Sequence, residues 1–379
     1  MFLYQQSNRY FAQIAGGLEA LGAAELGHLG ASNIHPVHRG LHFTADPNVL
    51  YRINYRSRLL SRVLAPLVTF KCHDDDYLYR KTKQIDWPSL LRLDQTFAVF
   101  ANVSGSKISH SQYAALRVKD GIVDLFRDKL GRRPDVDPRE PDLWINLHLA
   151  DDCATLSLDT SGGSLHRRGY RQESVEAPMQ ETVAAAIVEL SGWDGTRPLY
   201  DPMCGSGTLL SEAWLKYCCI PAGFLRRKFG FMMLPDFNPE IWRAEKKTAD
   251  ERIREIPGGH IRGSDRDRQA VGIARRNNTP LPYGDELRVQ TRDFRALKEL
   301  ENRVILCNPP YGMRLRGPGD IGDFYQELGD FLKQRCTGSE AYIYFGKREL
   351  IKKIGLRSTW KKPLANGGLD GRLVKYELF

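Results

Sequence analysis

The feature that most constrains the fold is a regular alternation of helix-like and strand-like segments over residues 178–379. The helix-like segments are ETVAAAIVELSGW, TLLSEAWLKYC, RQAVGIARRNN and DFYQELGDFLKQRC, and the strand-like ones are RPLYD, HIRGSD, LRVQTRDF, RVILC, EAYIYFGK and RLVKYELF. This alternation predicts an α/β domain with a doubly wound, mainly parallel sheet. Ligands of such sheets bind beyond the carboxyl ends of the strands, so residues that directly follow these strands are the first candidates for a site.

The first 160 residues predict a different architecture. Residues 1–65 show a β-α-β-α pattern, in which Asp46 and Pro47 are suited to the N-cap and first position of a helix. Residues 66–160 predict a second α+β unit that ends in two paired strands, DLWINLHLADD and CATLSLDTSG. Residues 161–177 lack apolar periodicity and are interpreted as a linker to the domain of residues 178–379.

Composition indicates a globular protein with a basic surface. No run approaches the roughly 20 apolar residues of a membrane span, and the start MFLYQQSNRY is too polar for a secretory signal, so we expect a cytoplasmic protein. The seven cysteines show no metal-ligand spacing, so we expect neither a metal nor a disulfide. The net charge of +9 lies mainly in residues 161–379 and suggests a polyanionic partner such as nucleic acid, although a solvated surface would also explain it.

A glycine-containing loop follows the strand RPLYD. We predict that it binds a cofactor through Asp201, Pro202, Met203, Cys204, Gly205, Ser206, Gly207 and Thr208. Leu210 stands where a dinucleotide-binding loop has its third glycine, and no Gly-Lys-Ser/Thr sequence of a phosphate-binding loop is present. An acid before the glycines suits a cofactor with a cationic part, and S-adenosylmethionine fits this demand.

Acidic residues also follow the next two strands. Asp265 is suited to accept hydrogen bonds from both ribose hydroxyls of a nucleoside, whereas Asp267 more commonly would cap the following helix. Asp293 and Phe294 follow the third strand and provide an acid for an adenine amine and a ring for its face. Taken singly, each of these aspartates is more often a helix cap than a ligand.

The strand VILC ends in Asn308, Pro309, Pro310 and Tyr311. Two prolines stop the strand and hold the backbone rigidly. The Asn308 side-chain carbonyl and the Pro309 backbone carbonyl could accept two hydrogen bonds from an exocyclic NH2 group, while Tyr311 stacks on the ring that carries it. Positioning the amine in this way requires no strong general base, so these four residues are the catalytic candidates.

Charged residues mixed with an aromatic one predict contacts with RNA phosphates and bases. The candidates are Arg167, Arg168, Tyr170 and Arg171 in the linker, together with Lys107, Arg132 and Arg133. A merely solvated linker is the alternative.

At this point the chain resembles a known family. DPMCGSGTLL, GSDRD and NPPYGMRL resemble the motifs of class I methyltransferases that act on amino groups. Together with SLHRRGYR, APMQETVAAAIVELSGW, DLWINLHL and LSLDTSG, they resemble THUMP-containing RNA guanine-N2 methyltransferases of the bacterial large-subunit (23S) rRNA type.

The resemblance implies a Rossmann-like, seven-stranded methyltransferase domain after ferredoxin-like and THUMP units that hold RNA, with S-adenosylmethionine as the cofactor and a flipped guanine as the target. One relative carries a second methyltransferase domain on its C-terminal side. Since this chain stops at Phe379, we expect it to perform at most the first of two reactions.

Several points stay open at this stage. Relatives usually carry an apolar residue in place of Arg266, which could lie over the adenine or point to solvent. The long segment 217–242, with Arg226, Arg227 and Lys228, could cover the site, touch RNA or be solvated. A tRNA guanine, a glutamine amide in a protein, and a non-catalytic RNA-binding role are the alternative functions. The modified nucleotide and the oligomeric state are not predicted.

Overall fold

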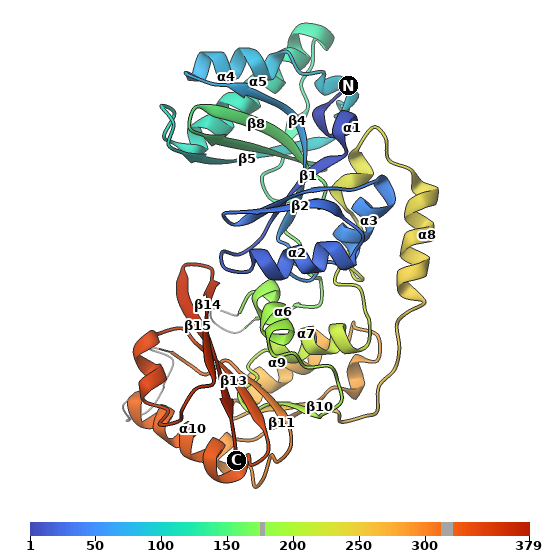
Figure 1. Cartoon of the computed structure of the whole chain (residues 1–379). Helices are drawn as coiled ribbons and strands as arrows, with labels where there is room; N and C mark the ends of the chain where they lie inside the picture. The colour runs from blue at the N-terminus through green and yellow to red at the C-terminus, as the bar shows by residue number, and fades with distance from the viewer. Residues whose placement is uncertain (175–178, 312–320) are drawn as a thin grey trace. The chain divides into compact units, whose positions relative to one another are not determined.

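The computed structural model describes residues 1–174, 179–311 and 321–379, and the chain divides into two compact units (Figure 1). The N-terminal unit contains Met1–Ile14, Leu21–Leu165 and Arg226–Lys246, and the C-terminal unit contains Ala15–Ala20, His166–Leu225 and Lys247–Phe379. The predicted linker is therefore part of the C-terminal unit from residue 166 onward, apart from residues 175–177, which lie outside the described residues.

One eight-stranded sheet runs through the whole N-terminal unit, in the order β2-β3-β1-β4-β8-β7-β5-β6. Its strands are β1 Arg9–Gln13, β2 Ser32–Val37, β3 Gly40–Thr44, β4 Arg62–Lys71, β5 Thr96–Ser104, β6 Asp135–Val136, β7 Leu143–Ala150 and β8 Cys153–Asp159. Strand β4 pairs with β1 on one side and with β8 on the other, both antiparallel. The two α+β units expected from the sequence therefore share a single sheet.

The helical segments that lie wholly or mainly in this unit include three that begin at a side-chain cap. The helical segments are α1 Leu3–Ser7, α2 Glu19–His28, α3 Pro47–Arg56, α4 Asp75–Lys83, η1 Trp87–Ser89, α5 Ser111–Leu130, η2 Gly230–Met233 and α8 Pro239–Asp250. Asp46 caps α3 by accepting a hydrogen bond from the Val49 amide at 2.8 Å, with Pro47 at the first position, so the predicted helix start is confirmed. Figure 1 shows α4 and α5 packed side by side over β5.

Residues 226–246 come from the middle of the sequence but belong to the N-terminal unit. Aromatic packing holds them there: the Phe231 ring stacks on Tyr51 at 4.5 Å, and the Trp242 ring meets Tyr55 edge-on at 5.2 Å between centroids. Such aromatic pairs add stability beyond the area that they bury. Most of the segment that the sequence left open is therefore a packed part of this unit.

Arg226 has a structural role in the same place. Its guanidinium donates hydrogen bonds to the backbone carbonyls of Ser161 at 2.7 Å and Ser164 at 3.0 Å. Gly230 lies so close to the chain that an added Cβ would fall 1.8 Å from the Asp159 carbonyl oxygen. Arg226 thus braces the turn after β8, whereas Lys228 is exposed and forms an ion pair with Asp142 at 3.6 Å.

The C-terminal unit contains a seven-stranded sheet in the order β11-β10-β9-β12-β13-β15-β14. Its strands are β9 Leu199–Asp201, β10 Ile261–Asp265, β11 Arg288–Thr291, β12 Val304–Cys307, β13 Glu340–Phe345, β14 Trp360–Asn366 and β15 Leu369–Glu377. The first five in this order pair in parallel, and β15 pairs antiparallel with β13 and β14. This is the predicted α/β class, with β14 as an additional edge strand that can accommodate Pro363.

Helices connect these strands, and α10 lies along the sheet (Figure 1). They are α6 Glu181–Leu190, α7 Thr208–Tyr217, α9 Arg268–Asn278, η3 Gly284–Glu286, η4 Phe294–Ala296, α10 Ile321–Arg335 and η5 Arg348–Lys352. Asp267 caps α9 by accepting from the Gln269 amide at 2.8 Å, as expected. Of the helices in the described part of the chain, none has the length and apolar character needed to cross a membrane.

Candidate active site

Parallel strands of the C-terminal unit end beside one another at one edge of the sheet. Because β9, β10, β11 and β12 run in the same direction, Asp201, Asp265, Asp293 and Asn308 all lie at this edge. A cavity opens there, with about 970 Å³ of empty space including its mouth. It is lined by Met179, Asp201, Pro202, Met203, Cys204, Gly205, Ser206, Thr208, Leu209, Asp265, Arg266, Asp293, Phe294, Arg295, Asn308, Pro310 and Phe324.

Most of the predicted cofactor-binding and catalytic residues therefore line one cavity, but not all of them do. Among the candidates, Gly207, Pro309 and Tyr311 are not part of its lining. Four residues line it without having been predicted: Met179, Leu209, Arg295 and Phe324, of which Leu209 and Arg295 stand next to predicted residues in the sequence. Arg266 is exposed at the cavity wall, which leaves both of its expected roles open.

The glycine loop, residues 201–208, needs its glycines for backbone conformation. Gly205 has φ 53° and Gly207 has φ 84°, in the left-handed region that glycine adopts at little cost. An added Cβ on Gly205 would meet nothing within 4 Å, whereas on Gly207 it would fall 3.1 Å from the Ala274 Cβ. Gly205 therefore faces open space, and Gly207 allows the loop to pack against α9.

Asp201 is almost completely buried at the start of this loop, with 1% of its surface exposed. Burial raises the pKa of its carboxyl well above the ordinary value; the Met203 amide, which donates to it at 3.0 Å, acts in the opposite direction, and nearby Asp265 adds to the rise. A carboxylate in this position is costly unless a cation or further donors accompany it. The surroundings of Asp201 are therefore suited to a positively charged group of a ligand.

Asp265 holds the glycine loop while keeping acceptor capacity. One carboxylate oxygen accepts from the Gly205 amide at 2.8 Å and the other from the Asp267 amide at 3.0 Å. Each oxygen can accept a second hydrogen bond, so the carboxylate can bind a pair of hydroxyls. Burial raises its pKa, and the two backbone amides moderate that rise.

Asp293 and Phe294 lie at the cavity but have other partners. Asp293 caps η4 through the Arg295 amide at 2.9 Å and forms an ion pair with the Arg295 guanidinium at 3.1 Å. The Phe294 ring is 2% exposed and meets Phe324 edge-on at 5.7 Å. Little of this ring can be offered to a ligand, which argues against the expected stacking of an adenine on its face.

The residues after β12 form the opposite wall. The Asn308 side-chain oxygen is buried and has no hydrogen-bond partner among the described residues, although its side chain borders the cavity. The Tyr325 hydroxyl donates to the Pro310 carbonyl at 3.3 Å, and the Tyr311 ring lies against Gly346, where an added Cβ would come within 2.7 Å. These contacts hold the motif in place, and the Asn308 side-chain oxygen remains available as a hydrogen-bond acceptor. Residues 312–315, which complete the motif NPPYGMRL, lie outside the described residues.

Two thiols close to the cavity are unsuited to nucleophilic chemistry. Burial raises the pKa of Cys204 and of Cys307 well above the usual thiol value, and the charges of Asp201 and Asp265 raise both further. Only the thiolate is a good nucleophile, so both remain inert at neutral pH. Within the described ranges, no group of three or more His, Cys, Asp or Glu side chains is placed to hold a metal ion.

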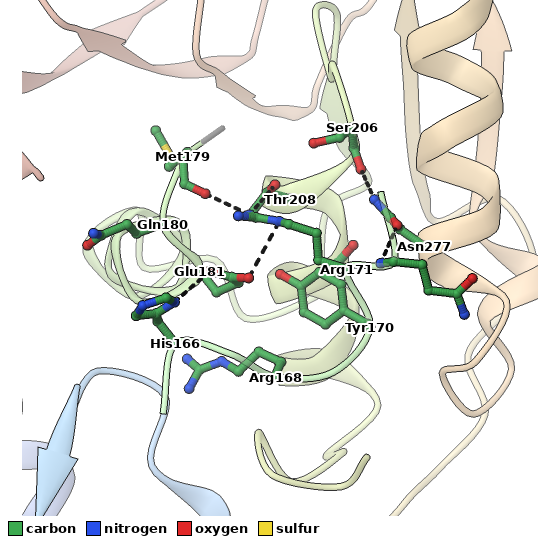
Figure 2. Close-up of polar contacts among 12 residues, drawn as sticks. His166, Arg168, Tyr170, Arg171, Met179, Gln180, Glu181, Ser206, Thr208 and Asn277 are labelled. Carbon is green, nitrogen blue, oxygen red and sulfur yellow. Dashed lines mark hydrogen bonds and ion pairs between the residues drawn. The ribbon is translucent and has the colours of Figure 1, made fainter. Parts of the chain in front are cut away.

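Of the predicted RNA-contacting cluster, Arg168, Tyr170 and Arg171 instead lie near the glycine loop, as Figure 2 shows, whereas Arg167 is exposed. Arg168 is 2% exposed and lies 3.4 Å from the Glu212 carboxylate, to which the Tyr170 hydroxyl donates at 3.0 Å. Arg171 donates to the Met179 carbonyl at 2.7 Å and the Thr208 hydroxyl at 3.0 Å. Predicting Arg168 and Tyr170 as RNA contacts was therefore wrong, because both are buried, and Arg171 is held by Thr208 and by Met179, which lies two residues before α6.

This cluster gives a prediction about stability. Arg168→Met should lower the free energy of unfolding by about 3–5 kcal/mol, because it leaves the buried Glu212 carboxylate without its cation. Thermal or urea unfolding would measure the loss. Arg132→Met provides the control, since Arg132 is exposed after α5 and its replacement should change stability by about 0.5 kcal/mol or less. A weaker RNA affinity of folded Arg168→Met protein, without loss of stability, would contradict this structural role.

The remaining RNA candidates are all exposed but do not form one patch. Lys107 precedes α5, whereas Arg132 and Arg133 follow it. A helix of 20 residues spans about 30 Å, so these two sites lie at opposite ends of that length. Contacts at both ends would require an extended RNA.

Comparison with known families agrees with this geometry. Residues 168–375 match the model of the RMKL-like methyltransferase domain, residues 72–159 match the THUMP domain, and residues 9–64 match the RlmL ferredoxin-like domain. The protein "Putative RNA methyltransferase slr0064" of Synechocystis sp. is 42% identical over 98% of this chain and 97% of its own length. The chain belongs to the RMKL-like RNA methyltransferases with a THUMP domain.

Two further relatives place the chain within this family. The "Ribosomal RNA large subunit methyltransferase K/L" of Syntrophotalea carbinolica is 39% identical over 98% of this chain but 53% of its own length, so the chain spans about half of that relative. The crystal structure of SMU.472, "a putative methyltransferase complexed with SAH", matches with a TM-score of 0.85 at 28% identity over 98% of both chains. Members of the family depend on S-adenosylmethionine.

The cavity fits this cofactor. The buried Asp201 provides a carboxylate for a cationic ammonium, Asp265 keeps acceptors for a pair of ribose hydroxyls, and Gly205 opens onto free space. Met203, Leu209 and Phe324 add apolar surface to the same cavity lining.

Proposed function

We propose that this chain methylates the exocyclic N2 of a guanosine in large-subunit (23S) ribosomal RNA of a bacterial cytoplasm. The observation that carries the proposal is the buried, unpartnered side-chain oxygen of Asn308 at the cavity wall. An oxygen in this position is costly unless a ligand donates a hydrogen bond to it, and an exocyclic NH2 group can do so. The name of the K/L relatives, of whose length this chain spans about half, supports ribosomal RNA of the large subunit as the substrate.

In this proposal, bound S-adenosylmethionine supplies an electrophilic methyl group on a positively charged sulfur. Asn308 accepts one N–H of the target amine and thereby directs the nitrogen lone pair toward that methyl carbon. A carbon–nitrogen bond forms as the carbon–sulfur bond breaks, and the proton of the methylated amine then leaves to water. Tyr311, supported by Gly346, provides a ring beside the base. Geometry of this kind can supply several kcal/mol of the barrier reduction.

We assign the remaining parts of the chain to RNA binding. Residues 1–65 and 66–160 would hold the RNA as ferredoxin-like and THUMP domains, and residues 178–379 would carry out the transfer. Base flipping costs least for an unpaired nucleotide, so the substrate would be naked or partly assembled ribosomal RNA rather than a finished subunit.

The two ends of α5 give a prediction about this RNA contact. If Arg132 and Arg133 neutralise phosphates, Arg132→Gln/Arg133→Gln should lower the slope of log affinity against log salt by about 0.7–0.9 for each phosphate that is no longer neutralised. Lys107→Gln, about 30 Å away along the helix, tests the other end independently. Salt slopes equal to the wild-type slope in both variants would remove these residues from the RNA surface.

A substrate competition tests the proposed function. Tritiated S-adenosylmethionine would be incubated with the protein and an equimolar mixture of unmodified ribosomal RNA, unmodified tRNA and a translation factor with a glutamine acceptor. We expect label mainly in ribosomal RNA. Label in tRNA would instead indicate a tRNA methyltransferase, and label in the translation factor would indicate a glutamine methyltransferase. A failure to bind the cofactor would favour a non-catalytic RNA-binding role.

A further inference from the structure

Residues 347–362, here called the basic segment, concentrate the positive charge of the chain. The sequence KRELIKKIGLRSTWKK contains seven Lys/Arg and one Glu, a net charge of +6, compared with +9 for all 379 residues. The segment includes η5 and reaches the start of β14, within the C-terminal unit. Most of the excess charge therefore lies in a short stretch that the RNA candidates described above do not include.

The cations of the basic segment are available to a partner. The side chains of Lys347, Lys352, Lys353, Arg357 and Lys361 are exposed. Across the described ranges, the ion pairs contain none of these five. Arg348 pairs with Asp370, and the Lys362 ammonium lies 4.8 Å from the centre of the Trp360 ring. Five cations so close together in the chain create a positive potential that attracts an anion.

The basic segment begins beside the motif that we assign to the target base. Strand β13 runs parallel to β12, so its end lies at the same edge of the sheet as Asn308. The next residue, Gly346, touches the Tyr311 ring: an added Cβ would lie 2.7 Å from the ring atom Cδ2. Lys347 and the rest of the segment follow directly from this contact.

The cavity itself has no excess of cationic side chains to attract RNA: its lining contains Arg266 and Arg295 together with three aspartates, and Arg295 is paired with Asp293. These aspartates suit a cationic cofactor but repel a chain of phosphates. A substrate strand must nevertheless bring a base to Asn308. Lys347 follows the end of β13 at that edge, and the cations after it in the basic segment would hold phosphates of the strand as it leads away from that base.

We propose that the basic segment binds phosphates of the RNA strand next to the target nucleotide and thereby holds the strand while the base enters the cavity. This inference rests on the proposed function, because it takes the substrate to be RNA. Lysines suit this role, since their flexible stems and point charges follow a backbone without reading its sequence. The N-terminal unit would then provide one RNA-binding surface, and the basic segment would provide a second one next to the reacting nucleotide.

Binding measurements on two matched double variants test this inference. Lys352→Gln/Lys353→Gln removes two exposed cations of the basic segment, and Lys298→Gln/Lys333→Gln removes two exposed cations before β12 and near the end of α10. Both proteins would be saturated with S-adenosylhomocysteine and titrated with a single-stranded fragment of unmodified ribosomal RNA between about 50 and 200 mM salt. Equal affinity for S-adenosylhomocysteine and equal melting temperatures would show that both variants are folded.

We expect the first variant to bind RNA roughly tenfold more weakly, with a salt slope lower by about 0.7 for each phosphate that the variant no longer neutralises, and the control variant to match the wild type. Equal RNA affinity and equal slopes in both variants would overturn the inference. The measurement does not depend on turnover: if the wild type failed to methylate ribosomal RNA, a selective loss of affinity in the first variant would still support the basic segment as an RNA-binding surface.

Discussion

Asn308→Ala is expected to lower the rate of methyl transfer by about 100-fold or more while changing the affinity for S-adenosylmethionine by less than about threefold. The buried side-chain oxygen of Asn308 has no partner among the described residues, so we propose that it accepts a hydrogen bond from the target amine rather than stabilising the fold. Removing it leaves the amine free to rotate away from the methyl carbon. Because that oxygen is already unsatisfied, the variant should unfold at a temperature equal to or above that of the wild type.

Single-turnover kinetics with saturating cofactor and RNA would measure the transfer step, and calorimetry with S-adenosylhomocysteine would measure cofactor binding. Gln334→Ala, at an exposed position of α10, is a suitable control and should leave both quantities unchanged. A comparable loss of rate and cofactor affinity in Asn308→Ala would assign Asn308 to the cofactor instead of the target base.

The second large effect is expected for Asp201→Asn, which should weaken S-adenosylmethionine binding by roughly 10- to 100-fold, since a hydrogen bond to a charged group contributes about 1.5–3 kcal/mol. The amide oxygen of asparagine can still accept from the Met203 amide, so the glycine loop should keep its shape. Calorimetric titration would measure the affinity. An unchanged dissociation constant would show that the cationic part of the cofactor does not lie at this residue.

The pH dependence of binding provides a separate test of Asp201. Burial raises the pKa of this carboxyl in the ligand-free protein, and a bound cation favours its ionised form. Cofactor affinity should therefore rise with pH until the raised pKa is passed, with release of a proton on binding, and then level off. The stability of the ligand-free protein should fall over the same range, from the ordinary carboxyl pKa upward, because the folded state holds this proton more tightly. In Asp201→Asn, cofactor affinity and the stability of the ligand-free protein should both depend less on pH. An unchanged pH profile would contradict the role of Asp201 in binding the cationic part of the cofactor.

The meeting of the candidate residues at one edge of the sheet was predictable, because each of them follows a strand. In a parallel sheet the strand ends converge, so Asp201, Asp265, Asp293 and Asn308 could be placed together without knowledge of any contact. The helix caps Asp46 and Asp267 were predictable for a similar reason, since a cap depends on local sequence alone.

The burial of charged residues could not be predicted in the same way. Arg168 looks like a surface residue in the sequence, because its partner Glu212 stands 44 positions away and nothing in the neighbouring residues indicates the pair. The packing of Phe231 on Tyr51 likewise joins residues far apart in the chain, so the assignment of residues 226–246 to the N-terminal unit had no local signal. Strand β14 was missed because WKKPLAN combines proline with two lysines, which suits an edge strand but weakens its pattern.

The most direct test of the proposed reaction is the chemical identity of the product. The protein would be incubated with labelled S-adenosylmethionine and unmodified bacterial ribosomal RNA, the RNA would be digested to nucleosides, and the labelled nucleoside would be identified by mass spectrometry, with Asn308→Ala as the negative control. We predict label in N2-methylguanosine, strongly reduced for the variant. Label in a methylated adenosine or cytidine, or equal label with wild type and variant, would contradict the proposed reaction.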